Sequence, residues 1–446
     1  MQTDEKGRMM KRYALEQLKN WKNSKTRKPL LVQGARQVGK TWLLKEFGRE
    51  CYENTAYVNF YDTPEAHNVF EGSYNVANII SALGSITNEQ IVPGKTLIIL
   101  DEIQECERAL NSLKFFNENA PQYHIAVAGS LLGVALKHKK MSFPVGQVDF
   151  LTLHPLSFCE FLEAFGKEML ARNIQENQID VLRMLHNDSV QLLKQYMVIG
   201  GMPEAVKTFI ETKDYESAQK VHKDILVSYQ NDFAKYTTSN NATKIMAVWN
   251  SVPVQLAKQM RKTKRFFFSD VLPGARSRNL EDAIEWLKLS GLIHLVPKVS
   301  KPSLPLASYA ESGAFKVYMI DTGLLSTMSG LAAKTVIDGD RIFQEFKGSL
   351  TEQYVLQELV LNDIRLNYWA SESDSEIDFM FQHEGDVVPV EVKANISLQA
   401  KSLQVYRKKY NPKFAVRTSL AGYEANEGLY NIPLYMIGNV LKIISE

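Results

Sequence analysis

The segment from Pro29 to Leu44, PLLVQGARQVGKTWLL, restricts the possible folds more than any other part of the sequence. Its apolar start predicts a buried strand, a glycine-rich stretch follows, and Trp42–Phe47 has the character of a helix. Strand, GxxxxGK[ST] and helix in this order are the context of a P-loop, whose backbone N–H groups surround phosphate oxygens. The segment therefore predicts an α/β fold with an open parallel sheet and a phosphate site at one edge.

Each position of the loop has a physical role. Gly34 and Gly39 allow backbone angles and a close approach that a side chain would prevent. We expect Lys40 to neutralise the β- and γ-phosphates and the Thr41 hydroxyl to bind Mg²⁺, so the predicted ligands are ATP and Mg²⁺. The predicted nucleotide-binding residues are Gly34, Ala35, Arg36, Gln37, Val38, Gly39, Lys40, Thr41 and Trp42.

A second apolar run, Thr96–Leu100, is followed by two carboxylates. Asp101 is predicted to hold Mg²⁺, directly or through water, and Glu102 to polarise the attacking water. Hydrolysing ATPases of the AAA type usually have this second acid, whereas a kinase that passes phosphate to a bound acceptor does not need it. Hydrolysis is therefore favoured, and a P-loop kinase is the less favoured alternative.

A third apolar run, His124–Ala128, ends in Gly129 and Ser130. Ser130 is a candidate catalytic sensor that would donate a hydrogen bond to the γ-phosphate or the lytic water, or else the N-cap of a helix over residues 131–136. Strands are expected near residues 30–32, 56–60, 97–100 and 125–128, with helices between them. Because ligands of open parallel sheets bind at the carboxyl ends of the strands, all these motifs meet at one edge.

The motifs together resemble a known group of prokaryotic proteins. They are GARQVGKT at 34–41, LIILDEIQ at 97–104, VAGS at 127–130, TLHPLSFCEFL at 152–162 and GGMP at 200–203. In this order they resemble a set of uncharacterised bacterial and archaeal AAA-type P-loop ATPases, from about residue 10 to the C-terminus. The resemblance implies a C-terminal domain of unknown function that is related to the PD-(D/E)XK restriction-endonuclease fold.

One position departs from this family. Many relatives carry Gly-Arg shortly before the His/Tyr-Pro-Leu-Ser segment, where this chain has Gly146-Gln147. If that arginine stabilises transition-state charge, this chain either lacks such a residue or uses another arginine. Arg36, Arg108 and an arginine of a neighbouring subunit are the alternatives. The last of them would require an oligomer. An arginine finger contributes on the order of 10³-fold or more in rate, so slow turnover is expected.

Residues 153–250 show helical patterns and few strand signals, and they predict a helical lid. Residues 251–312 then read as helix, turn, helix and strand, with the turn at Pro273-Gly274, which resembles a winged helix. Residues 255–279 carry seven Lys or Arg and one acid, in a chain with a net charge of only +2. Binding to DNA and packing against protein both remain open. The candidate DNA contacts are Arg261, Lys262, Lys264, Arg265, Arg276 and Arg278.

Carboxylates recur between residues 313 and 446. Glu352 lies in a predicted helix, Asp378 begins a predicted strand, and Glu391 and Lys393 point to one face of the next strand. This is the arrangement of PD-(D/E)XK nucleases, in which Asp378 and Glu391 would bind Mg²⁺, with Glu352 as a further ligand and Lys393 stabilising charge. A nuclease-like module that does not cleave, and a surface salt bridge, are the alternatives.

The remaining features exclude other classes of protein. The N-terminus has no apolar signal segment, no run approaches the ~18 apolar residues of a membrane span, and the histidines form no zinc pattern. Three cysteines without a CxxC pair favour reduced thiols and a cytoplasmic protein without membrane contact. The expected domains are residues 1–152 (AAA-type ATPase), 153–250 (helical lid), 251–312 (winged-helix-like) and 313–446 (nuclease-like).

Overall fold

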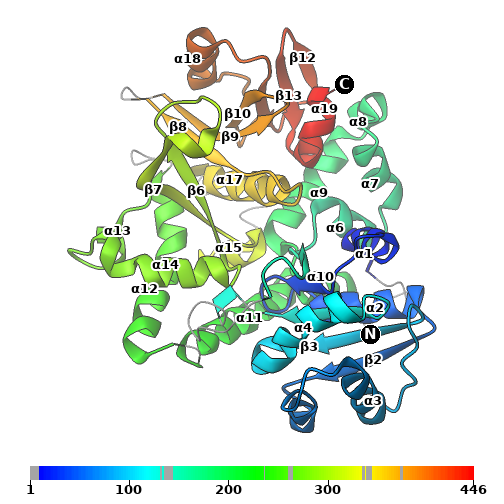
Figure 1. The fold of residues 1–446 in the computed structure, drawn as a ribbon. Coiled ribbons are helices and arrows are strands. Elements are labelled where there is room, and N and C mark those ends of the chain that lie inside the picture. Colours follow the sequence, from blue (N-terminus) through cyan, green and yellow to red (C-terminus); the bar gives the residue numbers. More distant parts are fainter. Residues whose placement is uncertain are drawn as a thin grey trace. The chain divides into compact units, whose positions relative to one another are not determined.

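The structure is a computed structural model that describes residues 10–130, 133–134, 144–235, 237–259, 265–333, 337, 344–371 and 375–445. The chain forms two compact units, and Figure 1 labels their elements. The first unit comprises residues 11–154 with 289–291, and the second mainly residues 155–288 and 292–446. Among the described residues, no helix combines the length and the apolar character that crossing a membrane requires.

The first unit is built on a five-stranded sheet of order β2-β3-β4-β1-β5 in which every neighbouring pair is parallel. β3 and β4 are buried along their whole length, as expected for central strands covered on both faces. The parallel α/β sheet predicted from the sequence is therefore confirmed. Its strands are β1 (Leu30–Gln33), β2 (Asn54–Asn59), β3 (Thr96–Asp101), β4 (His124–Gly129) and β5 (Asp149–Thr152).

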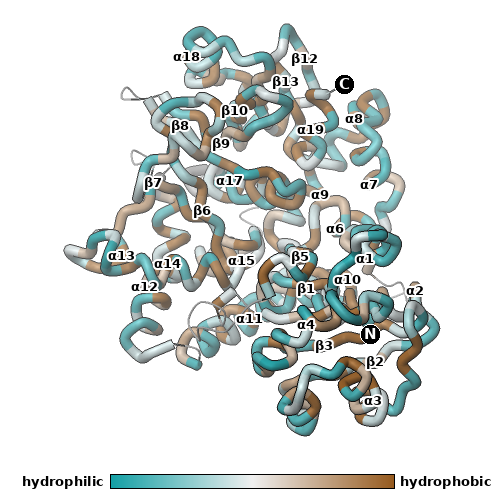
Figure 2. The backbone as a smooth tube through the Cα atoms, in the orientation of Figure 1, coloured by the Kyte–Doolittle hydropathy of each residue, from teal (hydrophilic) through white to brown (hydrophobic). Residues whose placement is uncertain are grey.

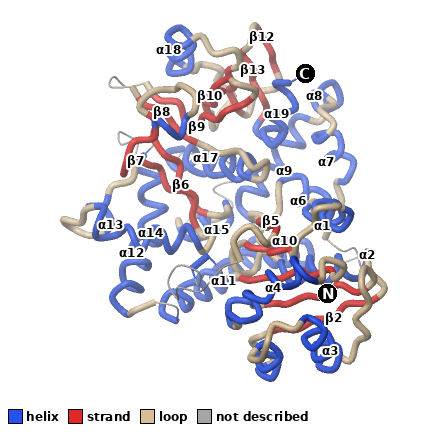
Figure 3. Tube along the Cα trace, viewed as in Figure 1, coloured by secondary structure: helices blue, strands red, loops and turns tan. Residues whose placement is uncertain are grey.

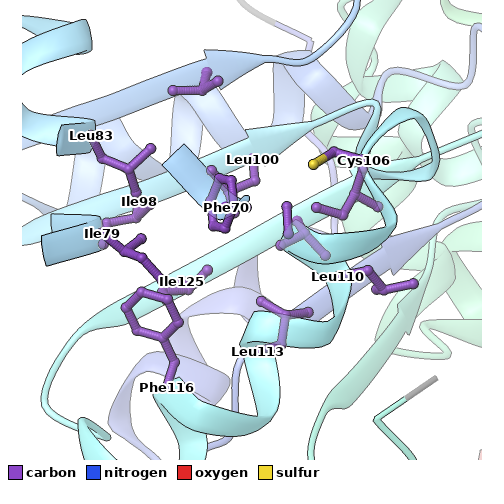
Figure 4. Packing of buried hydrophobic residues seen from close by; sticks show 14 of the residues in the cluster. Phe70, Ile79, Leu83, Ile98, Leu100, Cys106, Leu110, Leu113, Phe116 and Ile125 are labelled. Atoms are coloured by element: carbon purple, nitrogen blue, oxygen red, sulfur yellow. The ribbon is translucent and has the colours of Figure 1, made fainter. Parts of the chain in front are cut away.

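Helices connect β1 to β2, β2 to β3 and β3 to β4, as Figure 3 shows. One hydrophobic core joins Ile98 and Leu100 of β3 to Ile79 and Leu83 of the preceding helix and to Phe116 of the following one (Figure 4). This packing fixes the strands, and thereby the ends of the strands that carry the motifs. The helices are α1 (Ala14–Asn23), α2 (Lys40–Cys51), α3 (Val76–Thr87) and α4 (Glu107–Asn119), with short 3₁₀ segments η1 (Pro64–Phe70) and η2 (Ile103–Glu105).

The second unit begins with a helical region. Its helices are α6 (Phe158–Ala164), α7 (Glu168–Gln175), α8 (Ile179–Met184), α9 (His186–Ile199), α10 (Pro203–Thr212), α11 (Tyr215–Lys235) and α12 (Ser239–Gln259). α6 has a complete capping box, in which Ser157 and Glu160 satisfy each other's backbone N–H groups. Hydrophobic and polar residues alternate along these helices, as Figure 2 shows.

The GGMP motif forms a tightly packed turn within this unit. Gly200 has a φ of +68°, and a Cβ there would overlap the carboxylate of Asp321. A Cβ on Gly201 would overlap the carbonyl oxygen of Leu156, whose own N–H donates to the Gly201 carbonyl. Asp321 accepts the Gly201 N–H at 2.6 Å. The two glycines therefore let the α9–α10 turn pack directly against two other segments.

The second unit also contains a mixed sheet of eight strands, in the order β12-β13-β11-β10-β9-β8-β6-β7. Its strands are β6 (Ile293–Val299), β7 (Ala310–Met319), β8 (Asn367–Ala370), β9 (Glu376–His383), β10 (Asp386–Val392), β11 (Ala415–Ser419), β12 (Glu424–Asn426) and β13 (Leu429–Pro433). β6 pairs with β7 and also with β8, so these two strands continue the large sheet.

Further helices complete this unit. The α17-β8-β9-β10-α18-β11 segment forms a compact αβββαβ arrangement, with β9 antiparallel to β8 and β10, and β11 parallel to β10. A small core under α18 contains Trp369, Ile377 and Tyr406. The helices are α13 (Phe268–Val271), α14 (Ser277–Leu289), α15 (Thr322–Met328), α17 (Gln344–Val360), α18 (Lys401–Tyr410) and α19 (Val440–Ser445), with 3₁₀ segments η3 (Leu306–Tyr309) and η5 (Leu434–Asn439).

Candidate functional site

The loop between β1 and α2 has the backbone conformation of a phosphate-binding turn. Gly34, Gln37 and Gly39 all have positive φ angles, and α2 begins at Lys40 directly after Gly39. A left-handed non-glycine residue such as Gln37 is uncommon, and alternating backbone conformations of this kind turn successive N–H groups toward one point. Gly34 has a second role, because a Cβ there would overlap the carbonyl oxygen of Leu153.

Lys40 is buried against this loop. Its Nζ donates to the carbonyl oxygens of Gly34 at 3.0 Å and Ala35 at 2.7 Å. Burial lowers the pKa of Lys40 to about 8, although the charges of Glu102 and Asp101 act in the opposite direction. A poorly hydrated ammonium at a loop of this conformation and at the N-terminus of a helix is well placed to bind an anion.

Asp101, at the carboxyl end of β3, lies beside the first turn of α2. The Thr41 hydroxyl donates to its Oδ2 at 2.6 Å, and the backbone N–H of Glu102 donates to its Oδ1 at 3.0 Å. A hydroxyl and a carboxylate in contact are the hard oxygen ligands that Mg²⁺ prefers. These two residues therefore fit the metal predicted for them.

Glu102 lies next to this pair in an unusual conformation. Its φ is +52°, in the left-handed region, and its Oε2 accepts a hydrogen bond from Gln104 Nε2 at 2.5 Å. A non-glycine residue in this region is uncommon, and such residues cluster at functional sites as well as at turns and helix ends. The carboxylate is only partly buried, in contrast to Asp101.

Ser130 follows directly after β4, which lies between β3 and β1 in the sheet. It is buried and lies at the same edge of the sheet as Asp101 and the P-loop. Most of the helix for which Ser130 would be the N-cap, residues 131–136, lies outside the described residues.

Two residues of this site carried no sequence signal. Arg12 is buried and donates to the carbonyl oxygens of Val38 at 2.8 Å and His154 at 2.6 Å, so it braces the P-loop from the side. The hydroxyl of Tyr57, on β2, donates to Asp101 Oδ2 at 3.1 Å. Burial and the charge of Asp101 raise the pKa of Tyr57 to about 12, so it acts as a donor.

The structure also places the candidate arginines. Arg108 donates to the carbonyl oxygens of Phe70 and Gly72 and stacks over the Tyr74 ring. Its guanidinium is therefore already held by contacts with neighbouring residues. Gln147, which replaces the arginine of many relatives, accepts a hydrogen bond from Asn117 at 2.6 Å. Arg36 is exposed on the P-loop itself.

Of the candidate DNA contacts, Arg261, Lys262 and Lys264 lie outside the described residues. Arg265 is exposed, with its guanidinium over the Phe267 ring. Arg276 and Arg278 are exposed at the start of α14, as the helical pattern predicts, and two exposed acids, Glu281 and Asp282, follow them on the same helix.

The predicted C-terminal site residues come together in the second unit. Glu352 lies on α17, Asp378 on β9 and Glu391 on the adjacent β10, with Lys393 just after that strand. Asp378 Oδ2 accepts the Val392 N–H at 2.8 Å, and Lys393 Nζ donates to Glu391 Oε1 at 2.7 Å.

These carboxylates perturb one another. Burial, followed by the charges of Glu352 and Glu391, raises the pKa of Asp378 well above its usual value. Burial also raises the pKa of Glu391, against the opposing charge of Lys393. Among the described residues, no group of three or more His, Cys, Asp or Glu is arranged to hold a metal ion.

Sequence reasoning missed three further members of this cluster, Lys316, Tyr318 and Glu376. Lys316 is buried on β7 with its Nζ 2.5 Å from Glu376 Oε1, and Tyr318 donates to Glu352 Oε2 at 2.8 Å. Lys316 and Tyr318 are two residues apart on one strand and therefore share a face. The spacing alone does not distinguish them from the exposed residues of an edge strand.

Three family models match separate parts of the chain. Residues 26–162 match the AAA domain, which confirms an AAA-type P-loop domain in the first part of the chain. Residues 190–335 match a domain of unknown function, DUF8612, and residues 347–437 match another, DUF4143. No curated protein matches the chain.

Several solved structures are similar to parts of the chain. The Walker-type ATPase PABY2304 of Pyrococcus abyssi is 15% identical, with 73% of this chain and 97% of that chain covered and a TM-score of 0.43. The ORC2 protein of Aeropyrum pernix, in its ADPNP-ADP complexes, is 12% identical over 76% of this chain and 94% of that one, with a TM-score of 0.38. The RuvB Holliday junction branch migration motor of Thermotoga maritima is 14% identical over 65% and 90%, with a TM-score of 0.29.

Proposed function

We propose that this chain binds and hydrolyses MgATP and acts as an ATP-dependent switch, coupled to the binding of DNA or of a protein partner. One observation carries the proposal: the Thr41 hydroxyl and the Asp101 carboxylate are 2.6 Å apart beside a buried Lys40 at the start of α2. A hydroxyl, an acid and an ammonium at one loop are what binding a nucleoside triphosphate with its metal requires.

The loop residues 34–42 would bind the phosphates. Lys40 would exchange its bonds to the Gly34 and Ala35 carbonyl oxygens for phosphate oxygens. Thr41 and Asp101 would hold Mg²⁺, which neutralises charge on the phosphates when it is bound. Tyr57 orients Asp101 through its hydrogen bond to Oδ2, and Arg12 holds the loop through Val38.

Glu102 is the residue proposed to orient and polarise the attacking water, with Ser130 as the sensor of the γ-phosphate. The partly exposed carboxylate and the strained backbone of Glu102 support the role proposed for this residue. A P-loop kinase is the less favoured alternative, because transfer to a bound acceptor does not need a water-activating acid. Release of phosphate from ATP without any acceptor would exclude the kinase.

For DNA as the partner, specific residues of the chain can be proposed as contacts. Exposed Arg276 and Arg278 stand at the start of α14, where a helix that enters a DNA groove presents its contacts. Glu281 and Asp282, one turn further, favour a protein partner instead, because like charges repel the DNA backbone. Both partners remain within the proposal, and the winged-helix interpretation of residues 251–312 belongs to it.

The second candidate function is a DNA nuclease. The αβββαβ arrangement and the approach of Asp378, Glu391 and Lys393 favour it, since the acids would bind Mg²⁺ and the lysine would stabilise charge. Loss of DNA cleavage in Asp378→Asn and Glu391→Gln, with ATP hydrolysis unchanged, is the result that this candidate requires.

Phosphate release from MgATP, measured with and without double-stranded and single-stranded DNA, tests the main proposal. Stimulation by DNA favours a DNA-coupled switch, whereas slow hydrolysis that is indifferent to DNA favours a protein partner. A specific rate that rises with protein concentration would indicate that a neighbouring subunit supplies the arginine. Absence of hydrolysis under all conditions would contradict the ATPase.

A further inference from the structure

A lysine side chain lies inside the carboxylate cluster of the second unit. The Nζ of Lys316 is 2.5 Å from Glu376 Oε1, 3.5 Å from Glu352 Oε2 and 4.0 Å from Asp378 Oδ1. These acids come from β9 and α17, whereas Lys316 comes from β7. Its side chain is 2% exposed, so the ammonium exchanges its water shell almost entirely for carboxylate oxygens.

The carboxylates of this cluster form ion pairs with two different ammonium groups. Lys393 forms an ion pair with Glu391 Oε1. Lys316 forms ion pairs with Glu352, Glu376 and Asp378. Burial disfavours the charged form of Lys316, but the charges of Glu352 and Glu376 outweigh it, and the pKa of this lysine lies well above its usual value. Because its buried Nζ lies within 4.0 Å of three carboxylates, Lys316 places an ammonium group at the centre of these acids.

A divalent ion bound by Glu352 and Asp378 would have to use oxygens that face this ammonium. At separations of about 4 Å and in partly buried surroundings, repulsion between two cations is strong. Yet the cluster retains capacity to bind a cation. Glu391 Oε2 is buried and, within the described part of the chain, accepts no hydrogen bond. A buried acceptor without a donor is unfavourable and gains from a cation.

We propose that Lys316 is an internal counterion that occupies the cation position of this cluster, and that a divalent ion binds at Asp378 and Glu391 only when the ammonium is removed or displaced. The proposal is independent of ATP hydrolysis in the first unit. For the nuclease candidate it adds a condition, since metal-dependent cleavage would require Lys316 to leave the cluster.

Mn²⁺ binding to the full-length, nucleotide-free protein tests the proposal directly, with free Mn²⁺ followed by electron paramagnetic resonance. Lys316→Met removes the charge at similar side-chain length, and Lys316→Arg retains it. Asp378→Asn, introduced into each background, identifies the Mn²⁺ that belongs to this cluster, because sites elsewhere, the P-loop included, are unaffected. DNA cleavage is not measured, so the outcome does not depend on the proposed function.

We expect no Asp378-dependent Mn²⁺ binding in the wild-type protein or in Lys316→Arg. In Lys316→Met we expect such binding, with an affinity roughly 100-fold or more above the detection limit that the wild type does not reach, because a repelling charge has been removed. Asp378-dependent binding of equal strength in the wild type would overturn the proposal. So would a folded Lys316→Met that binds no Mn²⁺ at this cluster.

Lys316→Met leaves buried carboxylates without their counterion, which lowers the stability of the fold. Mn²⁺ should therefore raise its unfolding temperature, and Lys316→Met/Asp378→Asn should lose this effect. If Mn²⁺ has no such effect, the double variant Lys316→Met/Glu376→Gln restores the net charge of the cluster by removing one acid. Failure of this variant also to bind Mn²⁺ would contradict the counterion role.

Discussion

The carboxylate of Asp101 accepts hydrogen bonds from three donors, each at a different position of the first unit. Thr41 lies on α2, Tyr57 on β2, and the Glu102 N–H follows β3. Residues that orient a metal ligand typically change metal affinity by 10–100-fold when they are removed. Tyr57 is therefore expected to matter although it touches neither phosphate nor metal.

Tyr57→Phe should weaken the apparent affinity for Mg²⁺ by about tenfold, because the ring is kept while the hydrogen bond to Asp101 Oδ2 is lost, together with a long one (3.5 Å) from Asn59 Nδ2. The readout is ATP hydrolysis as a function of Mg²⁺ at fixed ATP. Tyr61→Phe, at a residue that is 66% exposed, is the matched control. An unchanged Mg²⁺ dependence in Tyr57→Phe would show that its hydroxyl does not orient Asp101.

Glu102→Gln should lower the rate of hydrolysis by about 100-fold or more while nucleotide binding persists, because a general base contributes typically 10²–10⁴-fold. Gln retains an oxygen that accepts the hydrogen bond from Gln104, so the local structure should survive. Phosphate release and equilibrium binding of a fluorescent ATP analogue separate the two effects. Normal turnover in this variant would remove Glu102 from the catalytic machinery.

At the scale of elements, the turn between α9 and α10 depends on a close backbone contact. Gly201→Ala should destabilise the second unit by about 2 kcal/mol or more, because the new Cβ overlaps the Leu156 carbonyl oxygen and rigid backbone must move. Gly422→Ala, where a Cβ meets nothing within 4 Å, is the control in the same unit. Equal unfolding midpoints for the two variants would contradict the packing explanation of the GGMP motif.

The start of α6 provides a pH-dependent element. Glu358 Oε1 accepts the Phe158 N–H at 2.8 Å, and burial raises the pKa of Glu358 from 4.5 to about 7. The folded protein thus binds a proton that the unfolded chain has released between pH 4.5 and 7, so stability falls as the pH rises through this window.

Glu358→Gln removes this loss of stability at high pH, and it keeps an oxygen that accepts the hydrogen bond from the Phe158 N–H. The variant should match the wild type below pH 4.5 and exceed it at pH 8, by a difference on the order of 3 kcal/mol. Denaturant unfolding at both pH values measures the difference. A variant that is less stable than the wild type at pH 8 would show that the ionised carboxylate is favourable there.

The sequence predicted the elements of the first unit where signals are local. The apolar runs before Gly34, Asp101 and Gly129 identify β1, β3 and β4, because central parallel strands are continuously apolar. β5, Asp149–Thr152, escaped prediction: it is short, and Phe150 is exposed, so neither alternation nor an apolar run marks it.

Residues that act through long-range contacts were also missed. Arg12 reaches Val38 and His154, and Lys316 reaches Glu352 and Glu376, across large separations in sequence. A lone Arg or Lys in a sequence is usually a solvated side chain, and only the tertiary fold shows that it is buried. Glu352, Asp378 and Glu391, in contrast, could be assigned to a helix and two strands from the sequence, because the patterns around them follow helix and strand periodicity.

At the scale of the whole molecule, the near-neutral net charge of +2 means that binding to DNA has to be local. If α14 contacts DNA, Arg276→Ala/Arg278→Ala should weaken binding and make the salt dependence shallower by about 0.9 for each lost phosphate contact. Lys223→Ala, at an exposed residue of α11, is the control. Fluorescence anisotropy over a salt series measures the slope, and an unchanged slope would direct attention to a protein partner.

The central claim is that the first unit hydrolyses ATP through the P-loop and Asp101. Steady-state phosphate release from MgATP by the wild type, by Lys40→Ala and by Lys114→Ala tests it most directly, since Lys114 is half-exposed on α4 of the same unit. We predict measurable release by the wild type and Lys114→Ala, and none above background by Lys40→Ala. Full activity in Lys40→Ala would contradict the account.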